Sequence, residues 1–189
     1  MHGVLALFLF GLYKGTKDKR MTGTIAIKRM KATEEAEKCA KMMANSEPWI
    51  TLGRGYESLL NTLTASAKEV YIGWAQKEIV GCITLIMQGA CVGYIQTVYV
   101  SPSWRGKGVG SALIAYAEER IFTEKPNVFI CVSSFNEGAR RWYKRLGYEE
   151  IGELKDYIVA GYSEILLRKT ISPLSEFVEE RNRQHLVKK

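Results

Sequence analysis

GYIQTVYVSPSWRGKGVGSALIAYAEER, residues 93–120, is the stretch of sequence that decides the fold. Tyr94–Val100 is rich in β-branched and aromatic side chains, as strands are, and Ser101-Pro102 ends it. Three glycines then precede a helical pattern that begins at Ser111. Glycines let the main chain approach a ligand closely, and a helix start presents unpaired N–H groups and a positive dipole end. We therefore predict a loop that binds a phosphate or pyrophosphate; a glycine turn without a ligand is the alternative.

The spacing of these glycines distinguishes between several kinds of anion-binding loop. The dinucleotide fingerprint G-x-G-x-x-G does not match the G-x-G-x-G found here, and the P-loop needs a lysine where Ser111 directly follows Gly110. RGKGVG, residues 105–110, instead resembles the R-x-x-G-x-G motif of the GNAT family of N-acetyltransferases, in which the motif holds the pyrophosphate of acetyl-coenzyme A. The residues that this resemblance assigns to the coenzyme are Arg105, Gly106, Lys107, Gly108, Val109, Gly110 and Ser111.

A second block, NEGARRWYKRLGY at residues 136–148, resembles a later motif of the same family. There an asparagine, a helix with a tyrosine and a closing glycine-aromatic pair follow a strand. The two blocks have the expected order and separation, and the resemblance covers about residues 24 to 170. It implies an α/β fold with a mixed, largely antiparallel central sheet flanked by helices, in which a splayed pair of strands forms the cleft for acetyl-coenzyme A.

The resemblance also implies roles for individual residues in acetyl transfer. Tyr143 would give a proton to the departing thiolate of coenzyme A, although Tyr143 and Leu146 could instead form an apolar helix face. Asn136 would orient the pantetheine arm, and an asparagine before a helix is also a common N-cap. The family's bulged strand, which exposes main-chain groups to the acetyl and pantetheine units, corresponds to Val98, Tyr99 and Val100.

The general base is not assigned by the resemblance. Relatives carry a glutamate where this chain has Gln96 or Cys131, and neither side chain is a good proton acceptor. Glu57, Asp156 and Glu164 remain as weak candidates, each of which could equally be a solvated surface charge. An amine that arrives already deprotonated would need no base.

The acceptor site is expected in the loop at residues 45–55, between two predicted helices. In the family this region receives the acceptor, and the candidate residues here are Trp49, Arg54 and Tyr56; Trp49 could instead cap the core. We predict transfer of an acetyl group to a primary amine, with a small molecule favoured over a protein N-terminus or lysine because the loop is long enough to cover a pocket. The absence of the family's glutamate leaves a non-catalytic module that senses acyl-coenzyme A as the alternative.

Composition and charge predict one domain with an anionic ligand. The chain has 189 residues and a net charge of +7, but residues 21–170 hold nineteen basic and sixteen acidic side chains, which favours an anionic cosubstrate and not nucleic acid. We interpret residues 21–170 as the N-acetyltransferase domain and residues 171–189 as a charged, helical tail. Residues 1–20 are interpreted as a leader or mis-set start outside the fold, with an interfacial anchor as the alternative.

The four cysteines form no C-x-x-C pair, which favours a reducing, cytoplasmic location without a metal. No membrane partner is expected, and a homodimer is left open. Elsewhere the pattern predicts strands at 24–29, 69–76, 78–87, 128–132, 148–151 and 161–168, and helices from residue 33 and over 56–66.

Overall fold

The computed structural model describes residues 25–89 and 92–187 of the chain. The predicted leader at residues 1–20 therefore lies outside the described residues. Within them the helices are α1 (Thr33–Ala44), α2 (Tyr56–Thr64), α3 (Val109–Phe122), α4 (Glu137–Arg145), α5 (Leu174–Val187) and the short 3-10 helix η1 (Pro102–Trp104). The strands are β1 (Ala26–Arg29), β2 (Lys68–Ala75), β3 (Glu78–Ile86), β4 (Tyr94–Val100), β5 (Asn127–Ser133), β6 (Glu149–Leu154) and β7 (Glu164–Thr170).

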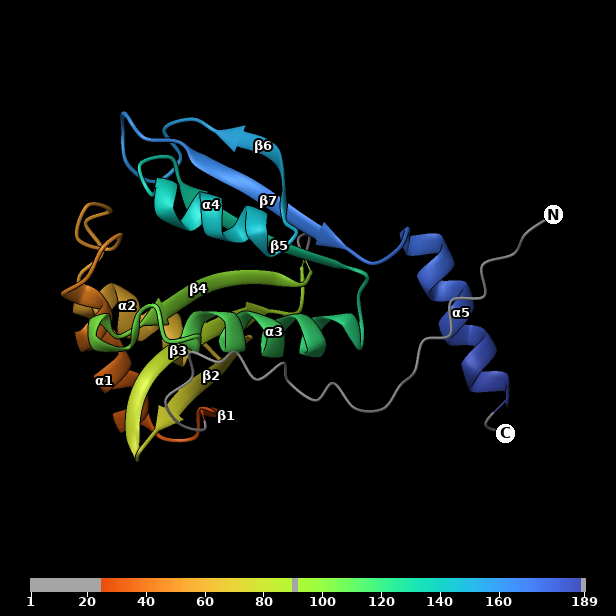
Figure 1. Ribbon diagram of the computed structural model, residues 1–189, viewed down its shortest axis with the longest axis horizontal. Helices are drawn as coiled ribbons and strands as arrows, with labels where there is room; N and C mark the ends of the chain where they lie inside the picture. Colours follow the sequence, from red (N-terminus) through yellow and green to blue (C-terminus); the bar gives the residue numbers. More distant parts are fainter. Residues whose placement is uncertain (1–24, 90–91, 188–189) are drawn as a thin grey trace.

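The strands described form one seven-stranded sheet in the order β1-β2-β3-β4-β5-β7-β6. Every neighbouring pair is antiparallel except β4 and β5, which are parallel. Figure 1 shows the sheet and the helices that flank it. The predicted mixed, largely antiparallel sheet is confirmed.

The parallel pair β4 and β5 is joined at one end only. Two register pairs connect these strands, Tyr94 with Phe129 and Ile95 with Ile130, although each strand has seven residues. A register shift in the β3–β4 ladder lies next to this point, where Gln96 is inserted between Ile95 and Thr97. A bulge of this kind bends a strand and increases its twist. β4 and β5 therefore diverge toward Val100 and Ser133, which confirms the predicted splayed pair.

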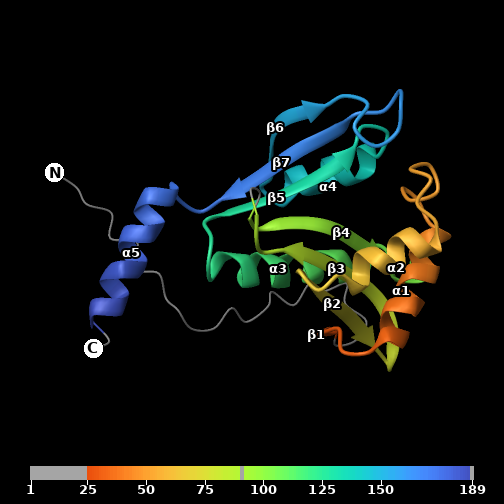
Figure 2. The same ribbon diagram turned by 180° about the vertical axis from the view of Figure 1, so that it is seen from behind.

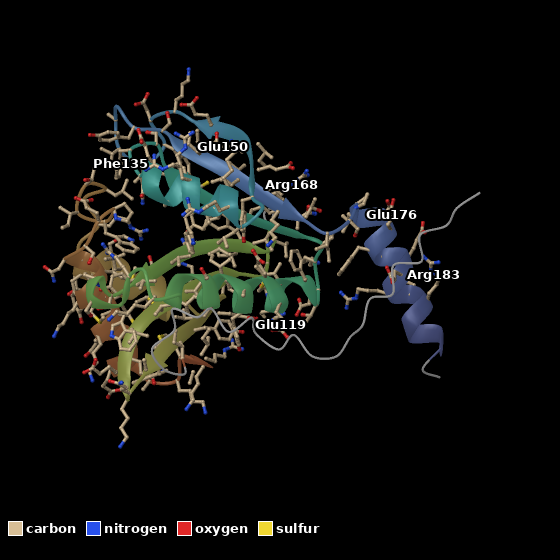
Figure 3. The ribbon with its side chains drawn as sticks, viewed as in Figure 1. Glu119, Phe135, Glu150, Arg168, Glu176 and Arg183 are labelled. Carbon is tan, nitrogen blue, oxygen red and sulfur yellow. The ribbon has the colours of Figure 1, made fainter. Side chains whose placement is uncertain are left out.

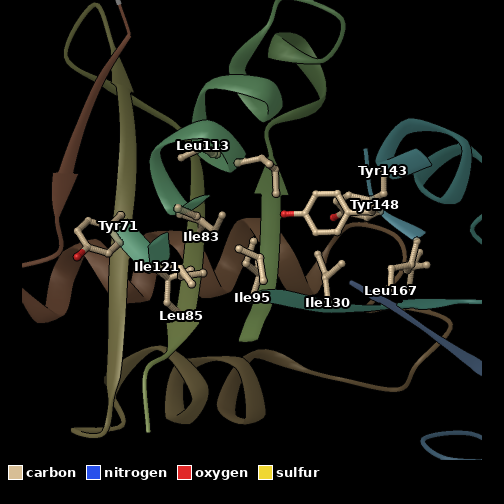
Figure 4. Packing of buried hydrophobic residues seen from close by; sticks show 14 of the residues in the cluster. Tyr71, Ile83, Leu85, Ile95, Leu113, Ile121, Ile130, Tyr143, Tyr148 and Leu167 are labelled. Carbon is tan, nitrogen blue, oxygen red and sulfur yellow. The ribbon is translucent and has the colours of Figure 1, made fainter. Parts of the chain in front are cut away.

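The sheet separates two hydrophobic clusters. The larger lies on the face covered by α3 and α4, and joins Leu113 and Ile121 of α3 to side chains of five strands. Figure 4 shows its strand side chains, among them Ile83, Leu85, Ile95, Ile130 and Leu167. The second cluster lies on the opposite face, where α1 and α2 pack against β2, β3 and β4. Since strand side chains alternate between faces, β2, β3 and β4 contribute to both clusters.

An ion pair joins α3 to β2, on the face of the sheet that α3 covers. Arg120 of α3 donates from Nη2 to Glu69 Oε1 at 2.7 Å and from Nε to Glu69 Oε2 at 2.9 Å. The Tyr71 hydroxyl donates to the same Oε2 at 2.7 Å. Burial raises the pKa of Glu69, but the hydrogen bonds from Arg120 and Tyr71 outweigh it, so that this pKa is lower than usual. The bidentate pair stabilises the orientation of α3, whose other end begins the candidate site.

The tail from residue 171 contains α5, which lies apart from the sheet in both ribbon views (Figures 1 and 2). Arg181 of α5 donates to the main-chain oxygen of Glu124 at 3.0 Å, just beyond the end of α3. Side chains of both charges are spread over the outer surface, for example Glu119, Glu150 and Arg183 (Figure 3). Across residues 25–89 and 92–187, we find no helix with the length and apolar character needed to cross a membrane.

Candidate active site

The glycine loop, residues 105–110, turns the chain from β4 into α3. Gly106 and Gly108 have φ angles of +72° and +82°, a region that other residues seldom adopt. Gly108 is the N-cap, so α3 begins at Val109 and not at Ser111 as the sequence predicted. Gly110 consequently lies in the first turn of the helix and not in the loop. A Cβ atom on Gly110 would lie 3.2 Å from the ring of Trp142 on α4, so the missing side chain here permits close packing of two helices.

The start of α3 is suited to an anion. None of the described side chains caps this helix, and its first turn has no acidic residue. The N–H groups of Val109, Gly110 and Ser111 therefore have no partner within the helix, and they lie at its positive end. Arg105 donates from Nε to Val100 O at 3.2 Å, and the Lys107 ammonium lies 5.2 Å from the centre of the Trp104 ring. These donors, with the Arg105 guanidinium beside them, suit the phosphates of a pyrophosphate.

A cavity of about 1930 Å³ extends from this loop through the gap between β4 and β5. Most of the residues predicted from the sequence to be in the site line it: Trp49, Arg54, Val98, Tyr99, Val100, Arg105, Gly106, Gly108, Gly110, Ser111, Asn136 and Tyr143. Three do not. The side chain of Val109 is fully buried in the larger cluster, Tyr56 packs against the second cluster, and Lys107 lies over Trp104. Only the main chain of Val109 can therefore contact a ligand.

Tyr143 and Asn136 both come from α4 and its N-cap. Tyr143 is only 5% exposed, and its ring centre lies 4.8 Å from that of Trp142 and 5.7 Å from that of Tyr148. Its hydroxyl makes no hydrogen bond to the part of the chain that the structure describes, and burial raises its pKa. Asn136 Oδ1 accepts a hydrogen bond from Ala139 N at 3.2 Å, which makes it the N-cap and leaves its side-chain amide N–H groups for a ligand.

The acceptor end of the cavity combines the loop at residues 45–55 with the loop between β6 and β7. Trp49 is 7% exposed and lies 5.7 Å from Tyr99 between ring centres, so it belongs to the second cluster and lines the cavity as well. Arg54 donates from Nη2 to Thr62 Oγ1 at 2.7 Å, which holds it against α2. From the β6–β7 loop, Tyr157 and Ile158 also line the cavity.

Of the three weak carboxylate candidates, only Glu164 lies in the cavity. Glu57 is exposed on α2, and Asp156 is exposed with its Oδ1 accepting from Gly161 N at 2.6 Å. Glu164, at 5% exposure, lines the cavity and accepts a hydrogen bond from Ser133 Oγ. Burial raises its pKa, and the bond from Ser133 offsets part of that rise. In the sequence Glu164 precedes the apolar run Ile165–Leu167, but Glu69 and Glu78 also precede apolar residues, so no local signal singles it out.

Comparison with known proteins assigns the chain to the same family that the sequences of the glycine loop and α4 resemble. The model of the Acetyltransferase (GNAT) family matches residues 30–148, more than half of the chain. The chain belongs to the GNAT family. The matched region contains the loop and both α3 and α4.

Individual relatives are similar over different extents. An uncharacterized N-acetyltransferase of Methanocaldococcus jannaschii is 38% identical over 71 residues, which cover 35% of this GNAT chain and 30% of the relative. An aminoglycoside 6'-N-acetyltransferase complexed with coenzyme A has a TM-score of 0.61 at 17% identity, covering 78% of this chain and 98% of that one. The ribosomal-protein-S18-alanine N-acetyltransferase of Escherichia coli has a TM-score of 0.62 at 15% identity, covering 79% and 96%. At these identities the two structures show the shared fold.

Proposed function

We propose that this GNAT domain transfers an acetyl group from acetyl-coenzyme A to a primary amine. The observation that carries the proposal is a continuous cavity of about 1930 Å³, which joins the anion-binding start of α3 to the two acceptor loops through the gap between β4 and β5. A coenzyme thioester and an amine could therefore meet inside the sheet. A structural neighbour described as a complex with coenzyme A supports the choice of donor.

Each part of the cavity has a proposed task. The N–H groups at the start of α3, with Arg105, hold the pyrophosphate, and the Asn136 amide contacts the pantetheine arm. Beyond Ile95, the main-chain groups of β4 that face β5 have no strand partner among the described residues, so they are available to the thioester and its developing oxyanion. Tyr143 gives a hydrogen bond and then a proton to the thiolate as the C–S bond breaks.

The acceptor that fits the cavity best is a small molecule with one amine on an apolar body. Leu52, Phe135, Tyr157 and Ile158 give the acceptor end an apolar and aromatic wall. Among the described lining residues, the carboxylates are Glu47 and Glu164, against three arginines, so a polycation would find little compensation for its charge. The names of the neighbours include both an aminoglycoside and a protein alanine as acceptors, so the fold leaves this choice to the loops.

Release of coenzyme A thiol with a panel of amines tests the proposal. The panel contains 2-phenylethylamine, spermidine, an aminoglycoside and a peptide with a free N-terminus. We expect release above hydrolysis with at least one amine, and the highest kcat/KM for 2-phenylethylamine. Tight binding of acetyl-coenzyme A without release would instead favour the acyl-coenzyme A sensor, the function suggested by Gln96 and Cys131 in place of glutamate.

We also propose a cytoplasmic location. Cys39 and Cys82 are buried in the second cluster and form no disulfide with any described residue. Free thiols persist in a reducing compartment, where acetyl-coenzyme A is also present as a metabolite. Fractionation of cells that express the untagged chain tests this location.

A further inference from the structure

The first residue of β7, Glu164, lies on the acceptor face of the sheet. Ile165 and Leu167 of the same strand belong to the larger cluster, on the face that α3 covers. Because strand side chains alternate between faces, Glu164 lies on the opposite face. In the register, Glu164 lies beside Ser133 of β5 and Leu154 of β6. This is the face that α1 and α2 cover and to which Trp49 belongs.

Glu164 and Tyr143 therefore border the gap from opposite sides of the sheet. Tyr143 belongs to the cluster under α3 and α4, and both residues line the same cavity. A nucleophile held at Glu164 would reach a thioester in the gap from one face, while Tyr143 would meet the leaving sulfur from the other. In addition–elimination at a carbonyl carbon the amine and the departing thiolate are separate substituents of the tetrahedral intermediate, so the base and the acid can act on them from different sides.

The electrostatic surroundings of Glu164 leave its charge uncompensated. Ser133 Oγ donates to Oε1, whereas Oε2 accepts no hydrogen bond and no cation pairs with the carboxylate within residues 25–89 and 92–187. A buried carboxylate without a cation is costly, and proteins seldom keep one without a task. A substrate ammonium group would supply the missing positive charge.

The neighbours of Glu164 also explain why β7 can supply this group. Cys131 and Gln96, at the positions where relatives carry glutamate, lie on the strands that border the gap. Cys131 is two residues from Ser133 on the same face of β5, so a carboxylate beside Ser133 reaches the same part of the cavity from the next strand. The titratable groups that face Glu164 are Tyr94 of β4 and Cys131 of β5; its β6 partner, Leu154, is uncharged.

We propose that Glu164 binds the ammonium group of the acceptor and takes its proton. The assignment rests on the proposed acetyl transfer and names the residue that selects and activates the amine. Glu164 accepts one proton from R–NH3+ and releases it to solvent through the cavity. The amine nitrogen attacks the thioester carbon, and as the C–N bond forms and the C–S bond breaks, Tyr143 protonates the thiolate. Glu164 takes the second proton from nitrogen and then releases it to solvent, the Tyr143 oxygen regains one proton from solvent, and the net products are the amide, the free thiol and one proton.

Glu164→Gln is the test, because the amide keeps the shape and can still accept the Ser133 hydrogen bond. With 2-phenylethylamine as the probe, we expect kcat/KM to fall about 10²-fold or more. The acid limb of the wild-type pH profile should disappear as well, since only an ionised carboxylate accepts the proton. Glu57→Gln, which removes an exposed carboxylate outside the cavity, is the matched control and should leave activity and its pH profile unchanged.

Two further measurements separate this proposal from the proposed function. Calorimetry with 2-phenylethylamine in the presence of coenzyme A should show binding to the wild type and about tenfold weaker or no binding to Glu164→Gln. Because the pKa of Glu164 is raised in the folded state, wild-type stability falls as the pH rises through that range, so Glu164→Gln should melt no lower than the wild type at neutral pH.

Amine binding that depends on Glu164 but gives no thiol release in the wild type would refute acetyl transfer and keep the amine site. Wild-type turnover with an equally active Glu164→Gln that retains the acid limb would overturn the role of Glu164 and keep the enzyme. Loss of activity in Glu164→Gln together with a lower melting temperature and unchanged amine binding would show a structural role, and would also overturn the proposal.

Discussion

Tyr143→Phe removes one hydroxyl from the cavity and leaves the packing of α4 in place. The ring keeps its contacts with Trp142 and Tyr148, at 4.8 and 5.7 Å between ring centres, and no hydrogen bond within the described residues is lost. We therefore expect the free energy of unfolding to change by less than about 1 kcal/mol. Coenzyme affinity should also be preserved, since the pyrophosphate is held at α3.

The loss should appear in turnover. A hydrogen bond to a charged group contributes about 1.5–3 kcal/mol, which corresponds to a fall of about 10- to 150-fold in kcat. The lower part of the range for general acids applies, because burial raises the pKa of Tyr143 and makes the phenol a weaker acid. The same shift keeps the phenol protonated through neutral pH, so no basic limb from Tyr143 should appear below about pH 10.

Thiol release at saturating substrates measures this effect, with calorimetry for the coenzyme and thermal melting for the fold. The matched control is Tyr148→Phe, which deletes a hydroxyl from the neighbouring buried ring that does not line the cavity. We expect kcat to fall for Tyr143→Phe alone. If kcat is unchanged in a folded Tyr143→Phe protein, or falls equally in Tyr148→Phe, Tyr143 is a packing residue and the acid role is wrong.

Two other substitutions test the coenzyme loop and the α3 anchor. Gly108→Val should raise the Kd for acetyl-coenzyme A about tenfold or more. Gly161→Val, at a similar φ of +85° outside the cavity, should introduce comparable backbone strain without loss of coenzyme affinity. Equal Kd values for the two variants would argue against the loop as the binding site. Glu69→Gln should lower the free energy of unfolding by about 1–3 kcal/mol at neutral pH, and Glu124→Gln, at the more exposed carboxylate paired with the same Arg120, by less than about 1 kcal/mol. Because the folded pKa of Glu69 lies below its ordinary 4.5, its contribution is present above that pH and should disappear as the pH falls through the lowered value; a difference from wild type that persists in acid would contradict the ion-pair explanation.

Local patterns in the sequence predicted the order of helices and strands, and most of the residues assigned from the family resemblance line the cavity. The strand before the glycine loop, Tyr94–Val100, was placed correctly, because its composition and the Ser-Pro pair that follows are both local signals. The start of α3 was placed two residues too late. Val109 and Gly110 are poor helix formers, and the N-cap conformation of Gly108 decides the boundary instead.

What the sequence could not show depends on contacts between distant segments. Gly110 was interpreted as a loop residue, but its environment is set by Trp142, which packs on it from α4. Glu164 could not be separated from Glu57 and Asp156, because its burial follows from the pairing of β7 with β5 beside Ser133. Strand register between segments 30 residues apart has no local signal, and the β6 and β7 boundaries were also misplaced for this reason.

Because the ladder between β4 and β5 is formed at one end only, the domain can open along the line between these two strands. One part of the sheet consists of β1 to β4 with α1, α2 and α3, and the other consists of β5 to β7 with α4. Within the described chain, the two register pairs at Tyr94 and Ile95 are the ladder contacts between these two parts. A ligand in the gap contacts both parts of the sheet and links them while it is bound. At about 100 times its Kd such a ligand adds about 2.7 kcal/mol to the folded state. Amide hydrogen exchange at Phe129, whose N–H donates to Gly93 O at 3.0 Å, would report opening between β4 and β5. Binding of acetyl-coenzyme A should slow exchange at Phe129 more than it slows exchange in β2.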